Sequence, residues 1–341
     1  MGPPGLEPGT YGLKVRYSAI ELRPLCSRWA RKFTARSVPT QAAASLIPSG
    51  NIRLVESAFF EPVGADSYIA TPATIGPWSA QAQHGGPPSA LAARAIEQHH
   101  RDPRQRLARV SIDILRPIPI GKVSVRTRTV RPGKRVALVE AVMEADGLEV
   151  LYARGWRIER PAGEVPVVRD DTRRPVPAPP AGEGKPPEIF RREHRGYLTS
   201  IEWRFDEADF SDHGGNAGPA ARPGPDGLEA RTRAAWTRPR IPLLAGEEMS
   251  PMSRALLVAD SGSGVSAVLP VSDFIFINVD LTVVLPRDPA GEWLLLEAVT
   301  TIGADGTGLA TTRLSDQNGS FGSAFQTLLV APVAARQAAG H

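Results

Sequence analysis

The chain has 341 residues, of which 42% are apolar, and its 40 Lys and Arg outnumber its 36 Asp and Glu by four. Residues 1–50 hold seven of the basic residues and two of the acidic ones, a local charge of +5, so the other 291 residues sum to −1. A body this close to neutral gives no electrostatic reason to expect a nucleic-acid partner, and no apolar run reaches the roughly 18 residues of a membrane span.

Residues 1–50 are expected to form a disordered basic extension. They are rich in Arg and Ser, and scattered prolines interrupt any long helix. The same composition is typical of an organellar transit peptide, which is the less favoured interpretation. The single cysteine, Cys26, lies here, which excludes disulfides, thiolate metal sites and a cysteine nucleophile from the rest of the chain. A reducing cytoplasm is therefore the expected location.

An N-terminal domain is predicted over residues 51–160. A helix is expected from Pro87 to His99, because its Ala, Leu and Ile residues make it largely apolar and prolines are tolerated in a first helical turn. Residues 106–160 alternate apolar and polar side chains as successive strands do. Breakers at Pro132-Gly133 and Asp146-Gly147 mark the turns between these strands.

A Pro-rich linker is predicted over residues 161–190, then a C-terminal domain over 191–333 and a tail over 334–341. The linker combines prolines and charges without periodicity. In the C-terminal domain a helix is expected from Pro251 to Val258, and Asp260 just after it is interpreted as a turn residue, with substrate contact as a lesser possibility. The expected strands cover residues 201–205, 234–243, 274–285, 293–302, 308–315 and 320–330.

The two domains match each other in the order of their elements. The helix starts at Pro87 and Pro251 correspond, as do the strand residues Asp113 and Asp280 and the turns at Asp146-Gly147 and Asn318-Gly319. We therefore expect an α+β protein made of two fused copies of one unit. Each copy is predicted to be a long helix packed on an antiparallel sheet, and the second copy is expected to continue the sheet of the first.

Several catalytic motifs are absent from the sequence. It has no G-x-S-x-G nucleophile elbow and no Walker A loop. The six histidines lack metal-binding spacing with nearby carboxylates, so neither a metal site nor a cofactor is expected.

Two stretches resemble a known family. The first is Gly76-Pro-Trp-Ser-Ala-Gln-Ala-Gln-His-Gly-Gly-Pro-Pro-Ser-Ala-Leu, and the second runs from Phe276-Ile-Asn-Val-Asp-Leu-Thr-Val to Phe325-Gln-Thr-Leu-Leu-Val. Together they resemble the acyl-CoA thioesterase II, or TesB-like, family. The resemblance implies a double hot-dog fold and an enzyme that hydrolyses fatty acyl-CoA to free fatty acid and CoA by direct attack of water.

The resemblance also implies which side chains hold that water. Asp280, Thr300 and Gln326 match the family's catalytic Asp, hydroxyl and Gln, and Thr301 is left open as the alternative hydroxyl because it points to the other strand face. Asn278 is expected to share the strand face of Asp280 and to orient its carboxylate. The chain departs from the more familiar members in having Thr327 after the glutamine, where they tend to have Glu.

The substrate is expected to meet the start of the first helix. His84, Gly85 and Gly86 precede it, and glycines let backbone N–H groups approach a thioester oxygen closely. The counterpart near Ser250 is the alternative position. CoA phosphates are expected near arginines of the N-terminal domain, with Arg116, Arg128, Arg131 and Arg154 as candidates. Because that domain lacks counterparts of Thr300 and Gln326, one working site per chain is predicted.

Two other functions stay open at this stage. A hot-dog hydratase or dehydratase would use His84 and a carboxylate to move protons on an acyl thioester. A non-catalytic module would bind acyl-CoA without needing the Asp, Thr and Gln, and Asp280 would then pair with an arginine in the sheet. The acyl chain length and the formation of a homo-oligomer are not predictable from the sequence.

Overall fold

The computed structural model describes residues 57–168, 176–182, 196–205, 230 and 232–333. The predicted extension at 1–50, the tail at 334–341 and parts of the linker at 161–190 lie outside these residues. No helix among the described residues is long and apolar enough to cross a membrane.

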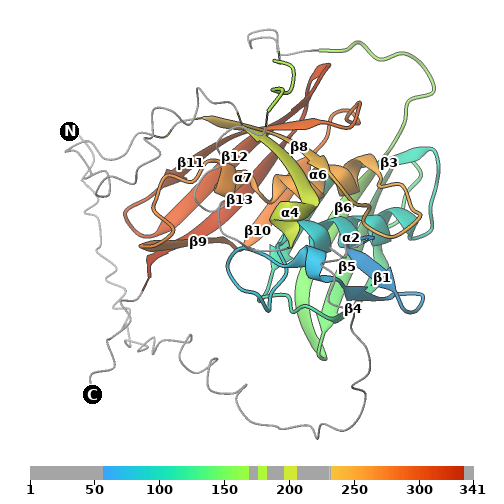
Figure 1. Ribbon diagram of the computed structural model, residues 1–341. Helices are drawn as coiled ribbons and strands as arrows, with labels where there is room; N and C mark the ends of the chain where they lie inside the picture. The colour runs from blue at the N-terminus through green and yellow to red at the C-terminus, as the bar shows by residue number, and fades with distance from the viewer. Residues whose placement is uncertain (1–56, 169–175, 183–195, 206–229, 231, 334–341) are drawn as a thin grey trace, which may run out of the picture. The chain divides into compact units, whose positions relative to one another are not determined.

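The described residues form thirteen strands in one sheet, antiparallel throughout (Figure 1). The strand order is β1-β2-β4-β5-β6-β3-β10-β13-β12-β11-β8-β7, and β9 pairs with β13 beside this path. The N-terminal half contributes β1 (Phe60–Pro62), β2 (Ser67–Ala70), β3 (Gln105–Ile114), β4 (Lys122–Arg131), β5 (Val136–Ala145) and β6 (Leu148–Glu159). The C-terminal half contributes β7 (Ile201–Phe205), β8 (Arg233–Pro239), β9 (Phe274–Asn278), β10 (Asp280–Val284), β11 (Leu294–Ile302), β12 (Thr307–Asp316) and β13 (Gly319–Pro332).

The two halves join through an antiparallel pair of strands, β3 and β10. Asp113 lies directly opposite Asp280 in this pair, which are the two residues that the sequence comparison matched. Equivalent residues that face each other across an antiparallel pair are the mark of a local two-fold relation. The predicted α+β architecture with one continuous sheet is thereby confirmed.

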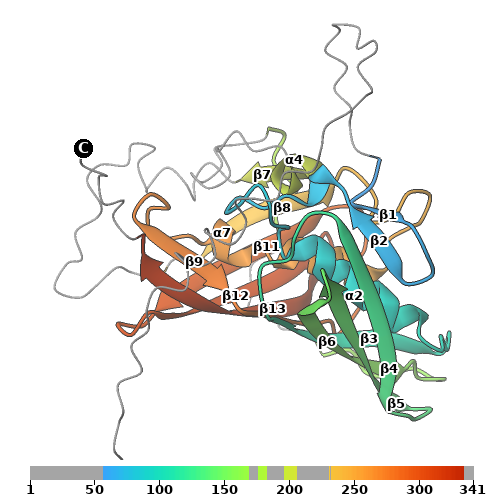
Figure 2. The same ribbon diagram turned by 90° about the horizontal axis from the view of Figure 1, so that it is seen from below.

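Five helical segments accompany the sheet in the described residues: the 3-10 turn η1 (Pro72–Thr74) and the helices α2 (Gly86–Gln98), α4 (Tyr197–Ser200), α6 (Pro251–Ala259) and α7 (Gly262–Val265). Figure 2 shows α2 and α7 on one side of the strands, which curve beneath them. Both predicted helices are confirmed.

The helices α2 and α6 pack against each other with little space between them. The Ser253 hydroxyl of α6 donates to the Ala90 carbonyl of α2 at 3.1 Å. A Cβ atom on Gly86 would lie 2.1 Å from the Leu257 carbonyl oxygen, a distance that no side chain tolerates. Gly86 is therefore required by the close approach of the two helices.

One strand prediction is wrong in a way that matters for the site. The expected strand at 274–285 is interrupted at Val279, which divides it into β9 and β10. Asn278 lies opposite Leu328, whereas Thr282 lies opposite Phe325, so this strand advances four residues while β13 advances three. The extra residue is a β-bulge, and it reverses which face the following side chains occupy. Asn278 therefore faces the helices, and Asp280 faces away from them.

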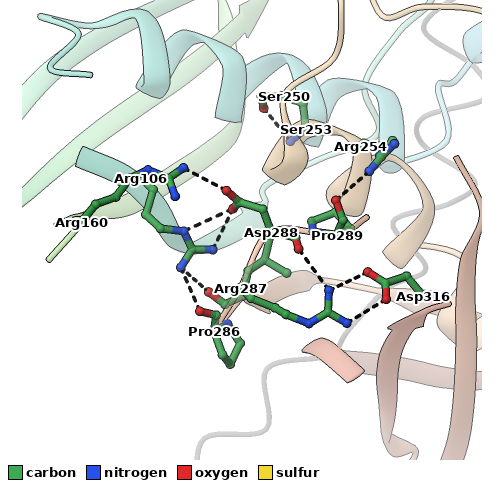
Figure 3. Close-up of polar contacts among 11 residues, drawn as sticks. Arg106, Arg160, Ser250, Ser253, Arg254, Pro286, Arg287, Asp288, Pro289 and Asp316 are labelled. Atoms are coloured by element: carbon green, nitrogen blue, oxygen red, sulfur yellow. Dashed lines mark hydrogen bonds and ion pairs between the residues drawn. The ribbon is translucent and has the colours of Figure 1, made fainter. Parts of the chain in front are cut away.

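Ion pairs gather at the far end of the helix pair (Figure 3). Asp288, after β10, accepts hydrogen bonds from Arg106 at 3.0 Å and Arg160 at 2.9 Å. Burial opposes the ionisation of Asp288, but the two arginines outweigh it and hold its pKa below the usual value. Glu97, near the end of α2, lies within hydrogen-bonding reach of Ser250, the N-cap residue of α6.

Glu97 makes the stability of the fold depend on pH. Burial raises the pKa of its carboxyl from 4.5 to about 7, the Ser250 hydrogen bond opposes this rise and the Asp288 charge adds to it. The folded chain then holds a proton that the unfolded chain has lost, so stability falls as pH rises from about 4.5 to about 7. Glu97→Gln removes this loss. We expect the variant to be more stable than the wild type by about 2 kcal/mol at pH 8 and equal to it at pH 4.5, allowing for partial solvent screening.

Thermal unfolding followed by circular dichroism across this pH range measures the effect. Glu61→Gln, a substitution of an exposed glutamate in β1, is the matched control and should give no pH-dependent difference. A constant offset between Glu97→Gln and the wild type at every pH would contradict the expectation.

Candidate active site

A cavity of about 400 Å³ opens between the two halves. Its wall is formed by the loop before α2, the end of β3 and the residues after it, the α6–α7 junction, and the bulged region between β9 and β10. Most of the wall is apolar, with Ile114, Ile118, Leu198, Phe276 and Val279 among its side chains. A hollow of this kind takes up an apolar group and holds it beside the few polar residues in the wall.

The loop before α2 is held rigidly from several sides. The His84 N–H donates to the Thr74 carbonyl at 2.8 Å, and the Gln83 N–H donates to the Ile118 carbonyl at 2.8 Å. Trp78 in the same loop meets Phe276 of β9 edge to face, with ring centroids 5.1 Å apart. These contacts fix the position at which His84 and Gly85 enter the helix.

A buried carboxylate lies at the centre of the polar residues. Asp260 directly follows α6 and is 5% exposed. Its Oδ2 atom is 3.1 Å from His84 Nδ1, and its Oδ1 atom accepts a hydrogen bond from Asn278 Nδ2 at 2.8 Å. Gly85 is required here, because a Cβ on it would lie 2.7 Å from Asp260 Oδ2. Asp260 ends α6 in a turn, as predicted, and it also contributes to the cavity wall.

Gln326 holds the segment that carries Asp260. Its side chain is 1% exposed, and its Nε2 donates to the Asp260 carbonyl at 2.9 Å, with a longer contact of 3.4 Å to Asp260 Oδ1. Its Oε1 accepts from the Ser263 N–H at 3.0 Å. Both ends of the buried amide are thus satisfied by the α6–α7 junction. A Cβ on Gly262 would lie 2.2 Å from Thr312 Oγ1, so the junction also rests directly on the sheet.

His84 is pinned between a tyrosine ring and the helix start. Its ring stacks on Tyr197 at a centroid distance of 3.7 Å with the planes 9° apart. The Tyr197 hydroxyl donates to the Leu257 carbonyl at 2.9 Å and lies 2.8 Å from Ser261 Oγ. Tyr197 belongs to α4, which follows the linker, and no sequence motif marks it. It ties His84 to α6.

The imidazole is kept neutral by its surroundings. Burial lowers the pKa of His84 below its usual value, and the Asp260 carboxylate opposes this only in part. His84 Nδ1 faces two partners, the Asp260 carboxylate and the Gly86 N–H, which lies 3.1 Å away. A ring with its proton on Nδ1 donates to Asp260, whereas a ring with Nδ1 bare accepts from Gly86. The position of the proton on this ring therefore decides which of these two partners Nδ1 bonds to.

Asp280 and Gln326 were predicted to lie together, but the structure separates them. Its carboxylate accepts hydrogen bonds from the backbone N–H and the hydroxyl of Thr327, the residue after Gln326. Consecutive residues of a strand point to opposite faces, so Asp280 and Gln326 lie on opposite sides of the sheet. The bulge at Val279 is the cause. The predicted convergence of these two side chains is wrong, and so is the prediction that Asp280 shares a strand face with Asn278.

Thr300 lies on the same side of the sheet as Gln326 but outside the group around Asp260. It is buried, and its Oγ1 is 2.7 Å from the Ser266 hydroxyl, just after α7. It does not contribute to the cavity wall. The neighbouring Thr301 is exposed and points to the opposite face. Of the predicted side chains, His84, Asn278 and Gln326 are brought together, with Gly85 beside them and Gly86 next along the chain.

Metal-binding residues are not gathered in this region. Within the described part of the chain, no three His, Cys, Asp or Glu side chains lie close enough to hold a metal ion. The polar groups around Asp260 include the His84 imidazole and the side-chain amides of Asn278 and Gln326.

Comparisons with known proteins agree on the fold. A solved structure from Thermobifida fusca YX, described as a thioesterase II, is 17% identical with a TM-score of 0.60, covering 81% of this chain and 96% of that one. A hot-dog protein of unknown function from Alicyclobacillus acidocaldarius is 16% identical with a TM-score of 0.57, covering 79% and 95%. The acyl-CoA thioesterase II TesB2 from Mycobacterium marinum is 16% identical with a TM-score of 0.54, covering 82% and 96%. The predicted double hot-dog fold is confirmed.

Comparison with curated proteins gives no match. Two family models do match. The acyl-CoA thioesterase N-terminal domain matches residues 74–158, and the acyl-CoA thioesterase C-terminal domain matches residues 170–330. Because the two matches together span well over half of the chain, the chain belongs to the acyl-CoA thioesterase family and is a thioester hydrolase.

Proposed function

We propose that the chain hydrolyses fatty acyl-CoA to free fatty acid and CoA, and that Asp260 activates the attacking water. The observation that carries this proposal is the buried carboxylate of Asp260, held by Asn278 and Gln326 at the wall of an apolar cavity. A base needs a fixed position beside the reacting carbon, and a thioester carbonyl is electrophilic enough to be attacked by a positioned water.

In the proposed reaction, Asp260 is the only proton acceptor on the enzyme. Water loses a proton to the carboxylate while its oxygen bonds to the thioester carbon, which leaves a tetrahedral oxyanion. The carbon–sulfur bond then breaks, and the proton passes from Asp260 to the departing CoA thiolate. No covalent intermediate on the enzyme is needed.

The start of α2 is the place proposed for the oxyanion. Pro87 and Pro88 carry no N–H, so Gly85 and Gly86 supply the backbone donors of the first turn. They lie at the positive end of a thirteen-residue helix, which adds to the stabilisation of a negative oxygen. When the proton of His84 is on Nδ1, the ring donates to Asp260 and no longer accepts from the Gly86 N–H. His84 is thus proposed to position both the base and one oxyanion donor.

The apolar wall is proposed to bind the acyl chain. Ile114, Ile118 and Phe276 line the cavity that Asp260 also reaches. Packing an apolar chain there excludes water from all but the reacting end, which strengthens the hydrogen bonds to the developing charge.

One observation favours a second candidate, a hydratase or dehydratase acting on acyl thioesters. His84 Nδ1 and Asp260 Oδ2 are 3.1 Å apart, and a His–carboxylate pair is suited to moving protons at the carbons next to a thioester. The two functions are distinguished by the products that they form. Incubation with octanoyl-CoA releases a free thiol if the enzyme hydrolyses, whereas incubation with 2-octenoyl-CoA loses the conjugated absorbance without thiol release if it hydrates.

Asp260→Asn tests the assignment of the base. The change keeps the shape of the side chain and removes its ability to take a proton, so we expect kcat for octanoyl-CoA hydrolysis to fall by about 10²- to 10⁴-fold. Asp280→Asn is the matched control, because it changes the carboxylate that lies on the other face of the sheet, and it should keep most of the activity. Thiol release under saturating substrate measures both. Loss of activity in Asp280→Asn with retention in Asp260→Asn would reverse the assignment.

Tyr197→Phe tests the support of His84. It keeps the stacked ring but deprives the Leu257 carbonyl and Ser261 of a buried hydroxyl, which should cost about 1 kcal/mol of stability. We expect kcat to fall several-fold with KM unchanged, because the base and the oxyanion donor lose alignment and the acyl pocket does not. Tyr197→Leu also removes the stacking and should lower kcat further. A rise in KM at constant kcat would show that Tyr197 serves binding instead.

A further inference from the structure

Among the described residues, one arginine lines the cavity, and it differs from the other arginines considered for phosphate binding. Arg128 and Arg154 both donate to Glu140, at 2.7 and 2.8 Å, and Arg131 donates to the Val136 carbonyl. Arg116 is exposed, contributes to the cavity wall, and forms no ion pair with any residue that the structure describes. Of the four, Arg116 alone combines a place in the cavity wall with an unused charge.

The backbone on either side of Arg116 is hydrogen-bonded to its neighbours, including the loop before α2. Just after it, the carbonyls of Ile118 and Pro119 accept hydrogen bonds from the backbone N–H and side-chain amide of Gln83, both at 2.8 Å. Just before it, the Leu115 N–H donates to the Val150 carbonyl at 3.0 Å. Gln83 immediately precedes His84 in the chain. The backbone around Arg116 is therefore held in a fixed relation to the start of α2.

The charges of the wall divide the cavity into two parts. Asp260 is buried and anionic groups of a ligand must avoid it, whereas Arg116 is at the solvent-exposed part of the wall. An acyl-CoA has an apolar acyl chain on one side of its thioester and, on the other, a pantetheine arm that ends at the phosphates. Guanidinium groups bind phosphate oxygens through two parallel hydrogen bonds. With the thioester at Asp260 and the acyl chain against the apolar wall, the CoA portion leads toward the exposed part of the wall, where Arg116 lies.

We infer that Arg116 binds the phosphate groups of the CoA portion and makes the enzyme prefer CoA thioesters over thioesters without phosphates. The inference rests on the proposed function and adds the residue that recognises the thiol portion of the substrate. Arg116 takes no part in the chemistry, so its contribution is to binding.

The experiment compares two substrates that share an acyl chain. Octanoyl-CoA carries the phosphates, and S-octanoyl-N-acetylcysteamine lacks them. For Arg116→Gln we expect KM for octanoyl-CoA to rise about 10- to 100-fold, the range for a lost hydrogen bond to a charged group, with kcat little changed. The kinetics with S-octanoyl-N-acetylcysteamine should match those of the wild type. Arg135→Gln, which replaces an exposed arginine outside the cavity wall, is the matched control and should change neither substrate.

Octanoyl-3′-dephospho-CoA tells which phosphate is bound. If the effect of Arg116→Gln disappears with this substrate, the 3′-phosphate is the partner, and if it persists, the diphosphate is. The inference would be overturned if Arg116→Gln raised KM equally for octanoyl-CoA and S-octanoyl-N-acetylcysteamine, or if it left KM for octanoyl-CoA unchanged. A rise in KM only for an acyl-CoA that has a terminal carboxylate on its acyl chain would also overturn it, because Arg116 would then bind the acyl end.

Binding separates this inference from the proposed function. S-octyl-CoA is a thioether that cannot be hydrolysed, and its Kd is measurable by calorimetry whether or not the enzyme turns over octanoyl-CoA. Arg116→Gln should weaken it about 10-fold or more, and Arg116→Lys should recover part of the loss. An unchanged Kd would reject Arg116 as the phosphate ligand, even if thioester hydrolysis is confirmed. If the wild type hydrolyses neither of the two octanoyl thioesters, the proposed function fails. The Kd comparison still decides the role of Arg116.

Discussion

The contact on which the site depends is the meeting of two helix ends, the start of α2 and the end of α6. Gly85 and Gly86 permit it, because any side chain there would collide with the Asp260 carboxylate or the Leu257 carbonyl. The contact places a carboxylate against the positive end of a helix dipole, where its charge is favourable. Both the base and the oxyanion donors of the proposed mechanism follow from this one packing arrangement.

The two related ends of the helix pair carry different side chains. The two halves are joined through β3 and β10, with Asp113 opposite Asp280, so the helix pair has two ends of related geometry. At one end Asp260 faces the start of α2, and at the other Glu97 faces the start of α6. The first end borders a cavity of about 400 Å³. At the second, Asp288 is held by Arg106 and Arg160 (Figure 3). Related backbone positions thus carry an open polar site at one end and an ion-pair network at the other.

The sequence predicts the elements of this fold well and the pairing of its site residues only in part. The two helices, the duplication and the strands around the turns follow from local patterns that the structure keeps. His84, Gly85, Asn278 and Gln326 are also brought to the site. Asp280 is not, because a one-residue bulge at Val279 turns it to the outer face. Strand alternation assumes regular pairing with a neighbour, and the register of that neighbour is a tertiary property that the local sequence does not reveal.

Asp260 and Tyr197 show a second limit of sequence reasoning. A carboxylate after a helix is most often a turn residue, and the significance of Asp260 comes from side chains 18, 66 and 176 positions away in the chain. Tyr197 lies next to the linker, where the sequence has no periodicity to interpret. Both residues acquire their roles from packing between segments that are distant in the chain.

The central claim is that water, activated by Asp260, attacks the thioester directly. A single turnover with enzyme in excess, in water enriched in a heavy oxygen isotope, tests this most directly. The account predicts that the released octanoate carries the heavy isotope and that the peptide containing Asp260 carries none when analysed by mass spectrometry. Unlabelled octanoate together with a labelled Asp260 peptide would show that the carboxylate is acylated first, and would contradict the account.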